Sequence, residues 1–221
     1  MGNYMTHHGI IEATVDVAKI RSTYTWMSRA YFLFAPLEKK ARMRGIELAR
    51  IQPGDNVLEV AVGIGHSFLE IMKRVGRTTT VQGVDLTPAM LEKTRRLVTS
   101  KGYTNFELRE CDARHLPFAD ETFDVLYNSY MLDLIPIADF SVALNEFRRV
   151  LKKNGRLVLV NFSKKDSAPV VLEKLYKLSP ALWGGCRPVI MESYAVNAGF
   201  KNVKREYPGT IFPSEIVAAI K

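Results

Sequence analysis

The chain has 221 residues, of which 47% are hydrophobic and 24% charged, and it contains two cysteines. This composition is typical of an ordinary globular domain and excludes a fibrous, disordered or disulfide-stapled protein. The net charge of +8 leaves open nucleic acid, anionic lipid or an acidic small molecule as a partner.

The first 50 residues are predicted to be a mostly helical segment of the same domain. Its aromatic stretch YTWMSRAYFLF, residues 24–34, would suit a lid over a bound ligand, although it would equally suit the buried stripe of a helix. The start MGNYMTHHGI lacks the features of a signal peptide, and the longest apolar runs are too short to span a bilayer. We therefore expect a cytoplasmic protein, with peripheral contact with an anionic membrane left open.

From residue 56 onward, short β-rich runs alternate with segments of helical period. Such alternation predicts an α/β domain over residues 51–221, with a mainly parallel sheet and helices on both faces. The expected segments are NVLEVA, HSFLEIMKRV, TVQGVD, TPAMLEKTRRLVTSK, NFELRE, FDVLYNSY, ADFSVALNEFRRVLK, RLVLVNF, SYAVNAGF, NVKREY and EIVAAI.

Local signals set the boundaries of these segments. Thr87 is predicted to cap a helix that begins at Pro88, and the helix in SYAVNAGF is expected to end at Gly199. Asn154 and Gly155 are expected to stop the helix before RLVLVNF with positive φ angles.

Positive charge is concentrated in residues 146–205, which carry thirteen Lys or Arg against four acids. A basic face of this kind can meet RNA or anionic lipid, but a solvated surface is an equally good interpretation. RGG tracts, zinc-finger spacing and RNA-binding aromatic signatures are absent from the sequence, so nucleic acid is not favoured.

The loop after the first expected strand, in VLEVAVGIGHSF, is the best candidate for a ligand site. Gly63 and Gly65 would let the backbone approach a ligand closely, beside the start of a helix. A dinucleotide loop needs a third glycine where Phe68 stands, and Glu59 would repel a diphosphate. A ligand with an amino group and no phosphate fits this loop better than NAD does.

Two further carboxylates follow the next strands. Asp85 can accept both hydroxyls of a ribose, and Asp112 would lie near the amino group of an adenine. Helix capping and solvation would explain one such residue, but they explain less well three carboxylates at three successive strand ends.

These segments, with VLEVAVGIG, GVDLTPAML, CDARHLPFADETFDVLYNSYMLDLI and LNEFRRVLKKNGRLVLVNFSK in order, resemble the motifs of class I S-adenosylmethionine-dependent methyltransferases. The resemblance implies a Rossmann-like, seven-stranded sheet with its last strand antiparallel. It also implies S-adenosylmethionine as cofactor and S-adenosylhomocysteine as product. Within that class, the chain looks like the ubiquinone/menaquinone biosynthesis C-methyltransferases, and bacterial phosphatidylethanolamine N-methyltransferases are the alternative.

The resemblance also implies a role for each matching residue. Glu59 and the backbone of Gly63 and Gly65 would hold the methionine part of the cofactor. The family usually has glycine where this chain has Ala61, the mildest available substitution, and we expect binding to be retained.

The remaining matches concern the nucleoside and the sulfonium. Asp85 would take the ribose and Leu86 would lie against the adenine. Asp112 and the amide of Ala113 would read the adenine edge, and Asn128 would lie beside the sulfonium.

The catalytic residues are left unknown. Tyr24 is expected to face the sulfonium from the lid, and no residue cluster suggests a metal site. A direct methyl displacement needs alignment and exclusion of water more than it needs a strong base. Candidates for a base or a hydrogen-bond donor are Tyr24, Tyr31, Tyr130, Asp133, His7 and His8.

The expected function is methyl transfer to a small, hydrophobic, quinol-precursor-like acceptor. A phospholipid N-methyltransferase and an RNA-directed methyltransferase remain alternatives, as do a nicotinamide oxidoreductase and a catalytically silent S-adenosylmethionine binder. The sequence specifies neither the acceptor atom nor the oligomeric state.

Overall fold

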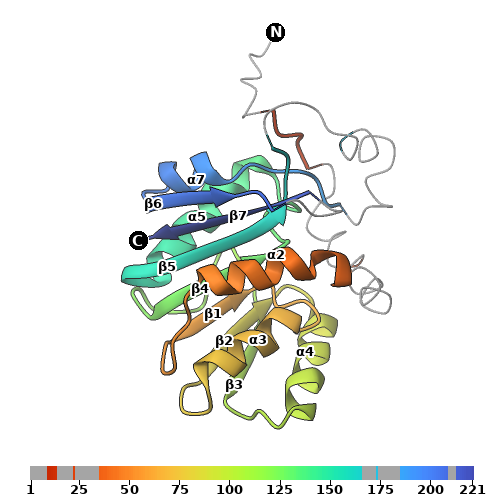
Figure 1. The fold of residues 1–221 in the computed structure, drawn as a ribbon, viewed down its shortest axis with the longest axis vertical. Helices are drawn as coiled ribbons and strands as arrows, with labels where there is room; N and C mark the ends of the chain where they lie inside the picture. The colour runs from red at the N-terminus through yellow and green to blue at the C-terminus, as the bar shows by residue number, and fades with distance from the viewer. Residues whose placement is uncertain (1–8, 14–21, 23–34, 166–172, 174–184, 209–212) are drawn as a thin grey trace.

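The computed structural model describes residues 9–13, 22, 35–165, 173, 185–208 and 213–221. They build a seven-stranded sheet in the order β3-β2-β1-β4-β5-β7-β6, with helices on both faces (Figure 1), which confirms the expected Rossmann-like fold. The strands are β1 (Val57–Val60), β2 (Val81–Asp85), β3 (Phe106–Glu110), β4 (Phe123–Ser129), β5 (Leu151–Phe162), β6 (Lys201–Glu206) and β7 (Ser214–Ile220).

Strands β1 to β5 pair in parallel, and β7 runs antiparallel to both β5 and β6. The implied antiparallel last strand is therefore confirmed. All four side chains of β1 are buried, as is typical of a parallel strand covered on both faces.

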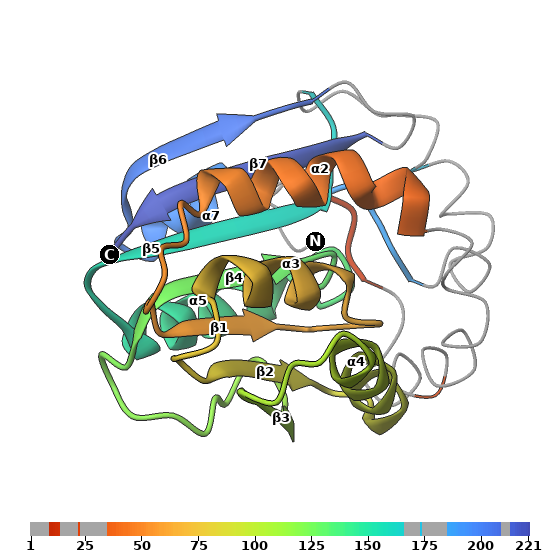
Figure 2. The same ribbon diagram turned by 60° about the horizontal axis from the view of Figure 1, so that its bottom comes forward.

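Two hydrophobic clusters lie on opposite faces of the sheet. One contains apolar residues of α2 (Ala35–Leu48), α3 (His66–Val75) and α4 (Pro88–Ser100). The other contains those of α5 (Ile137–Val150) and α7 (Glu192–Asn197). Figure 2 shows α2 lying along the sheet over β5 and β7, with α3 between α2 and β1 and with α4 at the right-hand end of β2.

Helix α2 is the longest described part of the segment, residues 8–50, that was expected to be mostly helical. It lies close to the sheet because Gly45 has no side chain, and a Cβ built there would be 2.6 Å from Cγ2 of Val160. Residues 9–13 are not helical. The aromatic stretch 24–34 lies outside the described residues, so the lid stays a prediction.

The expected end of α5 was wrong. The helix ends at Val150, and β5 begins at the next residue. Asn154 does have a positive φ of 66°. Phe123 pairs with Leu151, and Val125 pairs with Arg156. Residues 152–155 therefore form an irregularity inside β5, and they do not separate the helix from the strand.

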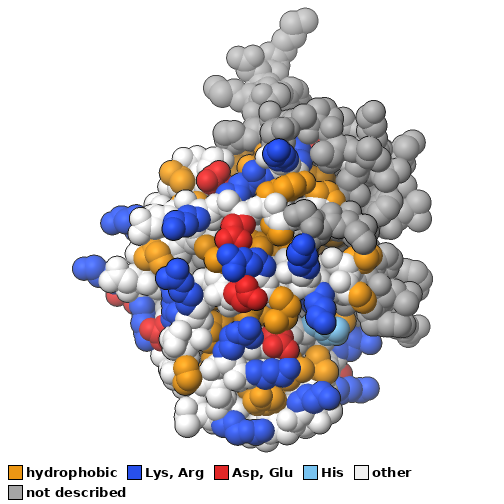
Figure 3. Space-filling view, viewed as in Figure 1, with side chains coloured by type: hydrophobic (Ala, Val, Ile, Leu, Met, Phe, Trp, Pro, Cys, Tyr) orange, Lys and Arg blue, Asp and Glu red, His pale blue; other side chains and the backbone are white. Residues whose placement is uncertain are grey.

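Most of the described Lys and Arg side chains of residues 146–205 are either paired with acidic groups or dispersed over the surface. Arg149 binds Asp120 and Glu146, and Arg205 binds Glu215. On the face in Figure 3, Lys and Arg side chains alternate with acidic and apolar ones. The exposed cations of this region in the described part of the chain are Arg148, Lys153, Lys165, Lys201 and Lys204. No helix within the described ranges is long and apolar enough to cross a membrane.

Candidate donor-binding cleft

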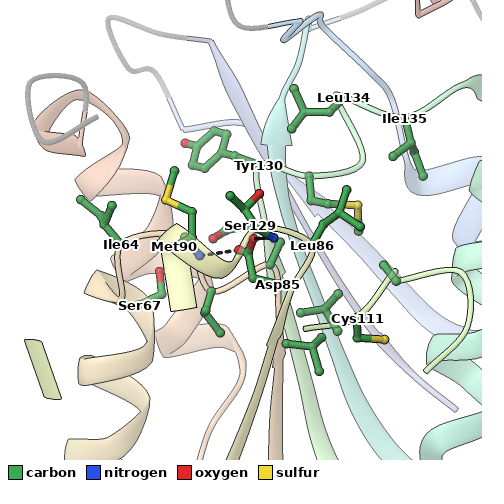
Figure 4. A pocket seen from close by; sticks show the side chains of 18 of the residues that line it. Ile64, Ser67, Asp85, Leu86, Met90, Cys111, Ser129, Tyr130, Leu134 and Ile135 are labelled. Carbon is green, nitrogen blue, oxygen red and sulfur yellow. Dashed lines mark hydrogen bonds between the residues drawn. The ribbon is translucent and has the colours of Figure 1, made fainter. Parts of the chain in front are cut away.

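A cleft opens at the carboxyl ends of β1, β2 and β4, where ligands bind in open α/β sheets. Figure 4 shows Asp85 near its centre, with Ile64, Ser67 and Met90 on one side and Tyr130, Leu134 and Ile135 on another. The predicted residues that line it are Ala61, Gly63, Asp85, Leu86, Asp112 and Ala113.

The two glycines of the loop have different surroundings. Both have positive φ angles, 54° at Gly63 and 86° at Gly65. A Cβ on Gly63 would meet nothing within 4 Å, because this residue faces the open cleft. A Cβ on Gly65 would lie 2.9 Å from both Cα and Oγ1 of Thr94. Gly63 therefore leaves space for a ligand, and Gly65 lets the loop pack against α4.

Ala61 occupies the left-handed region as well, with a φ of 63°. This conformation favours glycine, since a Cβ destabilises it by about 1–2 kcal/mol. The turn is nevertheless held in place, because the amides of Ala61 and Val62 both donate to the carbonyl of Val84, at 2.8 and 3.1 Å.

Asp85 joins the loop to the end of β2. Its Oδ2 accepts the amide of Gly63 and its Oδ1 accepts the amide of Thr87, each at 2.9 Å. Burial raises the pKa of Asp85 to about 6, although these hydrogen bonds act in the opposite direction. Each carboxylate oxygen has a second lone pair, so the side chain can also accept ribose hydroxyls. Thr87 is the predicted N-cap residue of α4, but its side chain makes no capping hydrogen bond.

Glu59 lies behind the loop and does not line the cleft, with an exposed fraction of 1%. Burial raises the pKa of Glu59 well above its usual value. The positive charge of Arg42 acts against this rise, and the negative charge of Asp85 adds to it. Its Oε2 has no hydrogen-bond partner among the described residues. A buried carboxylate oxygen in this state fits an ammonium group, which the implied cofactor carries.

The side of the cleft that follows β3 is built on Asp112. Arg114 binds this carboxylate at 2.6 Å and also binds Asp139 at 2.7 Å. Burial raises the pKa of Asp112, but the hydrogen bonds from Arg114 outweigh it and hold the pKa below the usual value. Asp112 therefore stays ionised and able to accept a hydrogen bond from an adenine amino group.

Asn128, which was predicted to lie beside the sulfonium, is not among the residues that line the cleft. The side chain is fully buried, and its Nδ2 donates to the carbonyl of Val60 at 2.9 Å, across the pairing of β4 with β1. The next residue, Ser129, lines the cleft instead. Successive side chains of a strand point to opposite faces, so an error of one residue reverses the orientation.

The remaining wall is mostly apolar and comes from the loop after β4, with Tyr130, Met131, Leu134 and Ile135. Tyr130 has a φ of 52°, and its hydroxyl lies 3.1 Å from the Oγ of Ser214. Burial raises the pKa of Tyr130 above its usual value, so this hydroxyl stays protonated. A neutral O–H group thus adjoins an apolar surface.

The other catalytic candidates are not in the cleft or not described. Asp133 is fully buried and is not among the lining residues, and burial raises its pKa to about 8. It is therefore mostly protonated at neutral pH and is a poor base. Tyr24, Tyr31, His7 and His8 lie outside the described residues.

Several lining residues were missed by the sequence prediction. Glu38 and Arg42 come from α2, Met90 comes from the first turn of α4, and His66 and Ser67 begin α3. Only the helix starts carried a usable signal, since residues there commonly face a ligand. Nothing in the spacing of Glu38 and Arg42 distinguishes them from an exposed i,i+4 ion pair.

A family model described as the ubiE/COQ5 methyltransferase family matches residues 16–181. The chain is 37% identical over 134 residues to a ubiquinone/menaquinone biosynthesis C-methyltransferase of Teredinibacter turnerae, a match that covers 60% of this chain and 52% of that protein. It is 32% identical over 188 residues to a protein of the same name from Xanthomonas axonopodis pv. citri, covering 80% of this chain and 74% of the relative.

Among solved structures, a SAM-dependent methyltransferase from Aquifex aeolicus superposes with a TM-score of 0.62 and 18% identity. This match covers 94% of this chain and 99% of that one, and it supports the fold. The family match, the fold and the carboxylate-lined cleft agree. The chain belongs to the ubiE/COQ5 methyltransferase family and is an S-adenosylmethionine-dependent methyltransferase.

Proposed function

We propose that the donor lies in the cleft with its methionine part at Glu59 and the Gly63 loop, its ribose at Asp85 and its adenine between Leu86 and Asp112. The order of these groups along the sheet edge matches the order of the parts of the cofactor. The buried Glu59 oxygen and the open space at Gly63 support this placement. Tyr24 is proposed as a further contact from the lid.

We also propose that the acceptor is a small, hydrophobic quinol precursor, methylated at a ring carbon. The observation that carries this proposal is the apolar wall of Met131, Leu134 and Ile135. Figure 4 shows Leu134 and Ile135 on the side of the cleft away from Ile64 and Ser67. A polar headgroup or a nucleotide would gain little from such a wall. The names of the two relatives agree with this acceptor class.

The cofactor supplies an activated methyl group on its sulfonium, and the residues of the chain supply position. Alignment of two reactants can lower a barrier by about 7–11 kcal/mol. The apolar wall would exclude water and orient the ring, and the protonated Tyr130 would donate a hydrogen bond to a ring oxygen. After the methyl group has been transferred, the ring carbon would lose its proton to solvent, because Asp133 is mostly protonated at neutral pH and is a poor acceptor.

The test is transfer of a radiolabelled methyl group to a panel of acceptors. The panel consists of a short-chain prenylated quinol lacking one ring methyl, phosphatidylethanolamine vesicles and total RNA. Label on a ring carbon of the quinol, located by mass spectrometry, is the expected result. Label in phosphatidylethanolamine alone would favour the phospholipid N-methyltransferase, and label in RNA alone would favour a role for the basic region; either would refute the quinol acceptor.

Peripheral contact with an anionic membrane is a further part of this proposal, since a hydrophobic acceptor partitions into lipid. The exposed cations Lys201 and Lys204 on the edge strand β6 support it. Co-sedimentation with anionic vesicles, lost at high salt, is the expected behaviour. Equal sedimentation with neutral vesicles would contradict an electrostatic contact.

A further inference from the structure

A buried arginine, Arg187, holds the loop that forms the apolar wall of the cleft. This wall loop, residues 130–136, connects β4 with α5. The guanidinium is fully buried and donates to the carbonyl of Asp133 at 2.8 Å and to that of Ile135 at 2.6 Å. The two carbonyls flank Leu134, which lines the cleft together with Ile135. Arg187 therefore fixes the backbone that presents these two apolar side chains, both labelled in Figure 4.

The same guanidinium holds a segment from near the beginning of the chain, residues 9–13. Its Nε donates to the carbonyl of Ile11. Lys164, which follows β5, donates to the carbonyl of Gly9 at 2.7 Å. Glu12 accepts the first amide of α5 at 3.0 Å, directly after the wall loop. Residues 9–13 are thus attached at three points, and two of these lie at the wall loop or next to it.

An arginine suits this position because the carbonyls of a buried, irregular loop need donors that no sheet or helix supplies. A guanidinium offers several donors in one rigid plane, whereas the ammonium of a lysine is a point charge on a flexible stem. The Cζ of Arg187 lies 5.6 Å from the centroid of the Phe140 ring, so α5 helps to orient this plane. Ile10 belongs to the same hydrophobic cluster as Met131, a further residue of the wall.

The donor side of the cleft has separate supports. Asp85 and the loop at Gly63 are joined by a hydrogen bond of 2.9 Å at the ends of β1 and β2. Neither Arg187 nor any of residues 9–13 lines the cleft. A change in these contacts should therefore reach the wall loop and leave the donor groups in place.

We propose that Arg187 is a positioning residue for the acceptor, because it fixes the shape of the wall loop and couples that shape to residues 9–13. This inference rests on the role in acceptor binding proposed above for the apolar wall. It follows that a substitution outside the cleft, in residues 9–13, alters the affinity for the acceptor while the affinity for the donor stays constant.

The test combines three measurements on the full chain. They are the KM for the short-chain prenylated quinol, the dissociation constant of S-adenosylhomocysteine by calorimetry, and hydrogen exchange of residues 130–136 followed by mass spectrometry. The variants are Arg187→Lys, which keeps the charge but loses the rigid fork of donors, and Glu12→Ala, which removes one contact of residues 9–13.

Two control variants change similar contacts away from the wall. Arg156→Lys alters a guanidinium that donates to the carbonyls of Ala49 and Arg50. Asp124→Ala removes a carboxylate that accepts the amide of Asn56 at 2.9 Å. Both residues lie near the amino end of β4, and the cleft lies at its carboxyl end.

Arg187→Lys is expected to raise the KM for the quinol by about tenfold, the effect of weakening one or two hydrogen bonds to buried carbonyls. Glu12→Ala should raise it by about threefold. Both variants should exchange faster in residues 130–136, because local opening of the wall loop becomes easier. The dissociation constant of S-adenosylhomocysteine should stay within about twofold of the wild-type value. The control variants should leave all three measurements unchanged.

Two outcomes would overturn the inference. An unchanged KM in both variants would mean that Arg187 and residues 9–13 do not position the acceptor. Equal losses of affinity for the quinol and for S-adenosylhomocysteine would mean that the substitutions loosen the whole domain. If circular dichroism shows that Arg187→Lys is unfolded, Glu12→Ala decides by the same criteria, since Glu12 is exposed and its removal leaves the core intact.

A failure of the proposed function would be a separate result. If the wild-type chain transfers no methyl group to the quinol, the acceptor class is wrong, and hydrogen exchange then decides the inference. Faster exchange confined to residues 130–136 in the folded variants would support the coupling of the wall loop to residues 9–13, and unchanged exchange would refute it.

Discussion

Alanine at Gly63 and alanine at Gly65 are expected to separate ligand binding from folding. Both residues have positive φ angles, so either alanine adds about 1–2 kcal/mol of backbone strain. The alanine also restricts the unfolded chain, which returns about 0.4–1 kcal/mol. For Gly63→Ala nothing further is lost, because its Cβ would have no neighbour within 4 Å. The expected loss of stability is therefore about 1 kcal/mol.

Gly65→Ala adds a collision with the backbone of Thr94, since the new Cβ would lie 2.9 Å from its Cα. Overpacking of this kind destabilises by about 1–3 kcal/mol, so the total loss should be about 2–4 kcal/mol. The methyl group of Gly63→Ala instead projects into the cleft, where a clash of only about 1.4 kcal/mol with the donor lowers affinity tenfold.

Urea unfolding at constant m value measures the first effect, and calorimetry with S-adenosylhomocysteine measures the second. Gly63→Ala should be stable and bind poorly, and Gly65→Ala should be the less stable of the two. Equal destabilisation of both variants, or full donor affinity in Gly63→Ala, would refute the roles assigned to the two glycines.

Three further predictions concern Ala61, Asp85 and Arg187. Ala61→Gly should raise the free energy of unfolding by up to about 1 kcal/mol, because it relieves left-handed strain; a lower urea midpoint would contradict this. Asp85 has a folded pKa of about 6 against an ordinary value of 3.8, so its contribution to stability is fully present below pH 3.8 and is lost as the pH rises through 6. Donor affinity should depend on pH in the opposite sense and increase as the pH rises through about 6, because the ionised carboxylate is the better acceptor. Calorimetry at a series of pH values checks this, and an affinity that does not change with pH would count against the ribose role. Arg187→Met should destabilise the chain by about 3 kcal/mol or more, because the buried guanidinium donates to the carbonyls of Ile11, Asp133 and Ile135. An unchanged melting temperature would show that these carbonyls find other partners.

The sequence was sufficient to predict the order of the elements and most of one side of the cleft. Strand and helix periods differ clearly, and the carboxyl ends of parallel strands meet at one edge, so Asp85 and Asp112 could be brought together without coordinates. The helix starts at His66 and Pro88 were confirmed, because proline is over-represented at the first helical position and glycine is modestly enriched at the N-cap, as at Gly65.

Other features depend on contacts that are distant in sequence. The junction of α5 with β5 was misplaced because Asn154 has the left-handed angle of a helix stop, but here it lies in an irregular strand. Asn128 was assigned to the cleft by motif position, but the pairing of β4 with β1 buries it against Val60. Arg42 was missed because only the packing of α2 on β5 and β7 brings it to the cleft.

The carboxylates of the cleft connect donor binding with stability. Glu59 and Asp85 both have raised pKa values because burial disfavours their charged forms, and the charge on Asp85 raises the pKa of Glu59 further. Without a ligand these groups oppose folding at neutral pH. A donor that brings an ammonium to Glu59 removes part of this penalty, and ligand binding to the folded state alone stabilises it by about 2.7 kcal/mol at one hundred times the dissociation constant. Under the proposed donor placement, an ammonium at Glu59 would therefore be favoured over a neutral nucleoside, because only the ammonium would stabilise the charged form of this buried carboxyl.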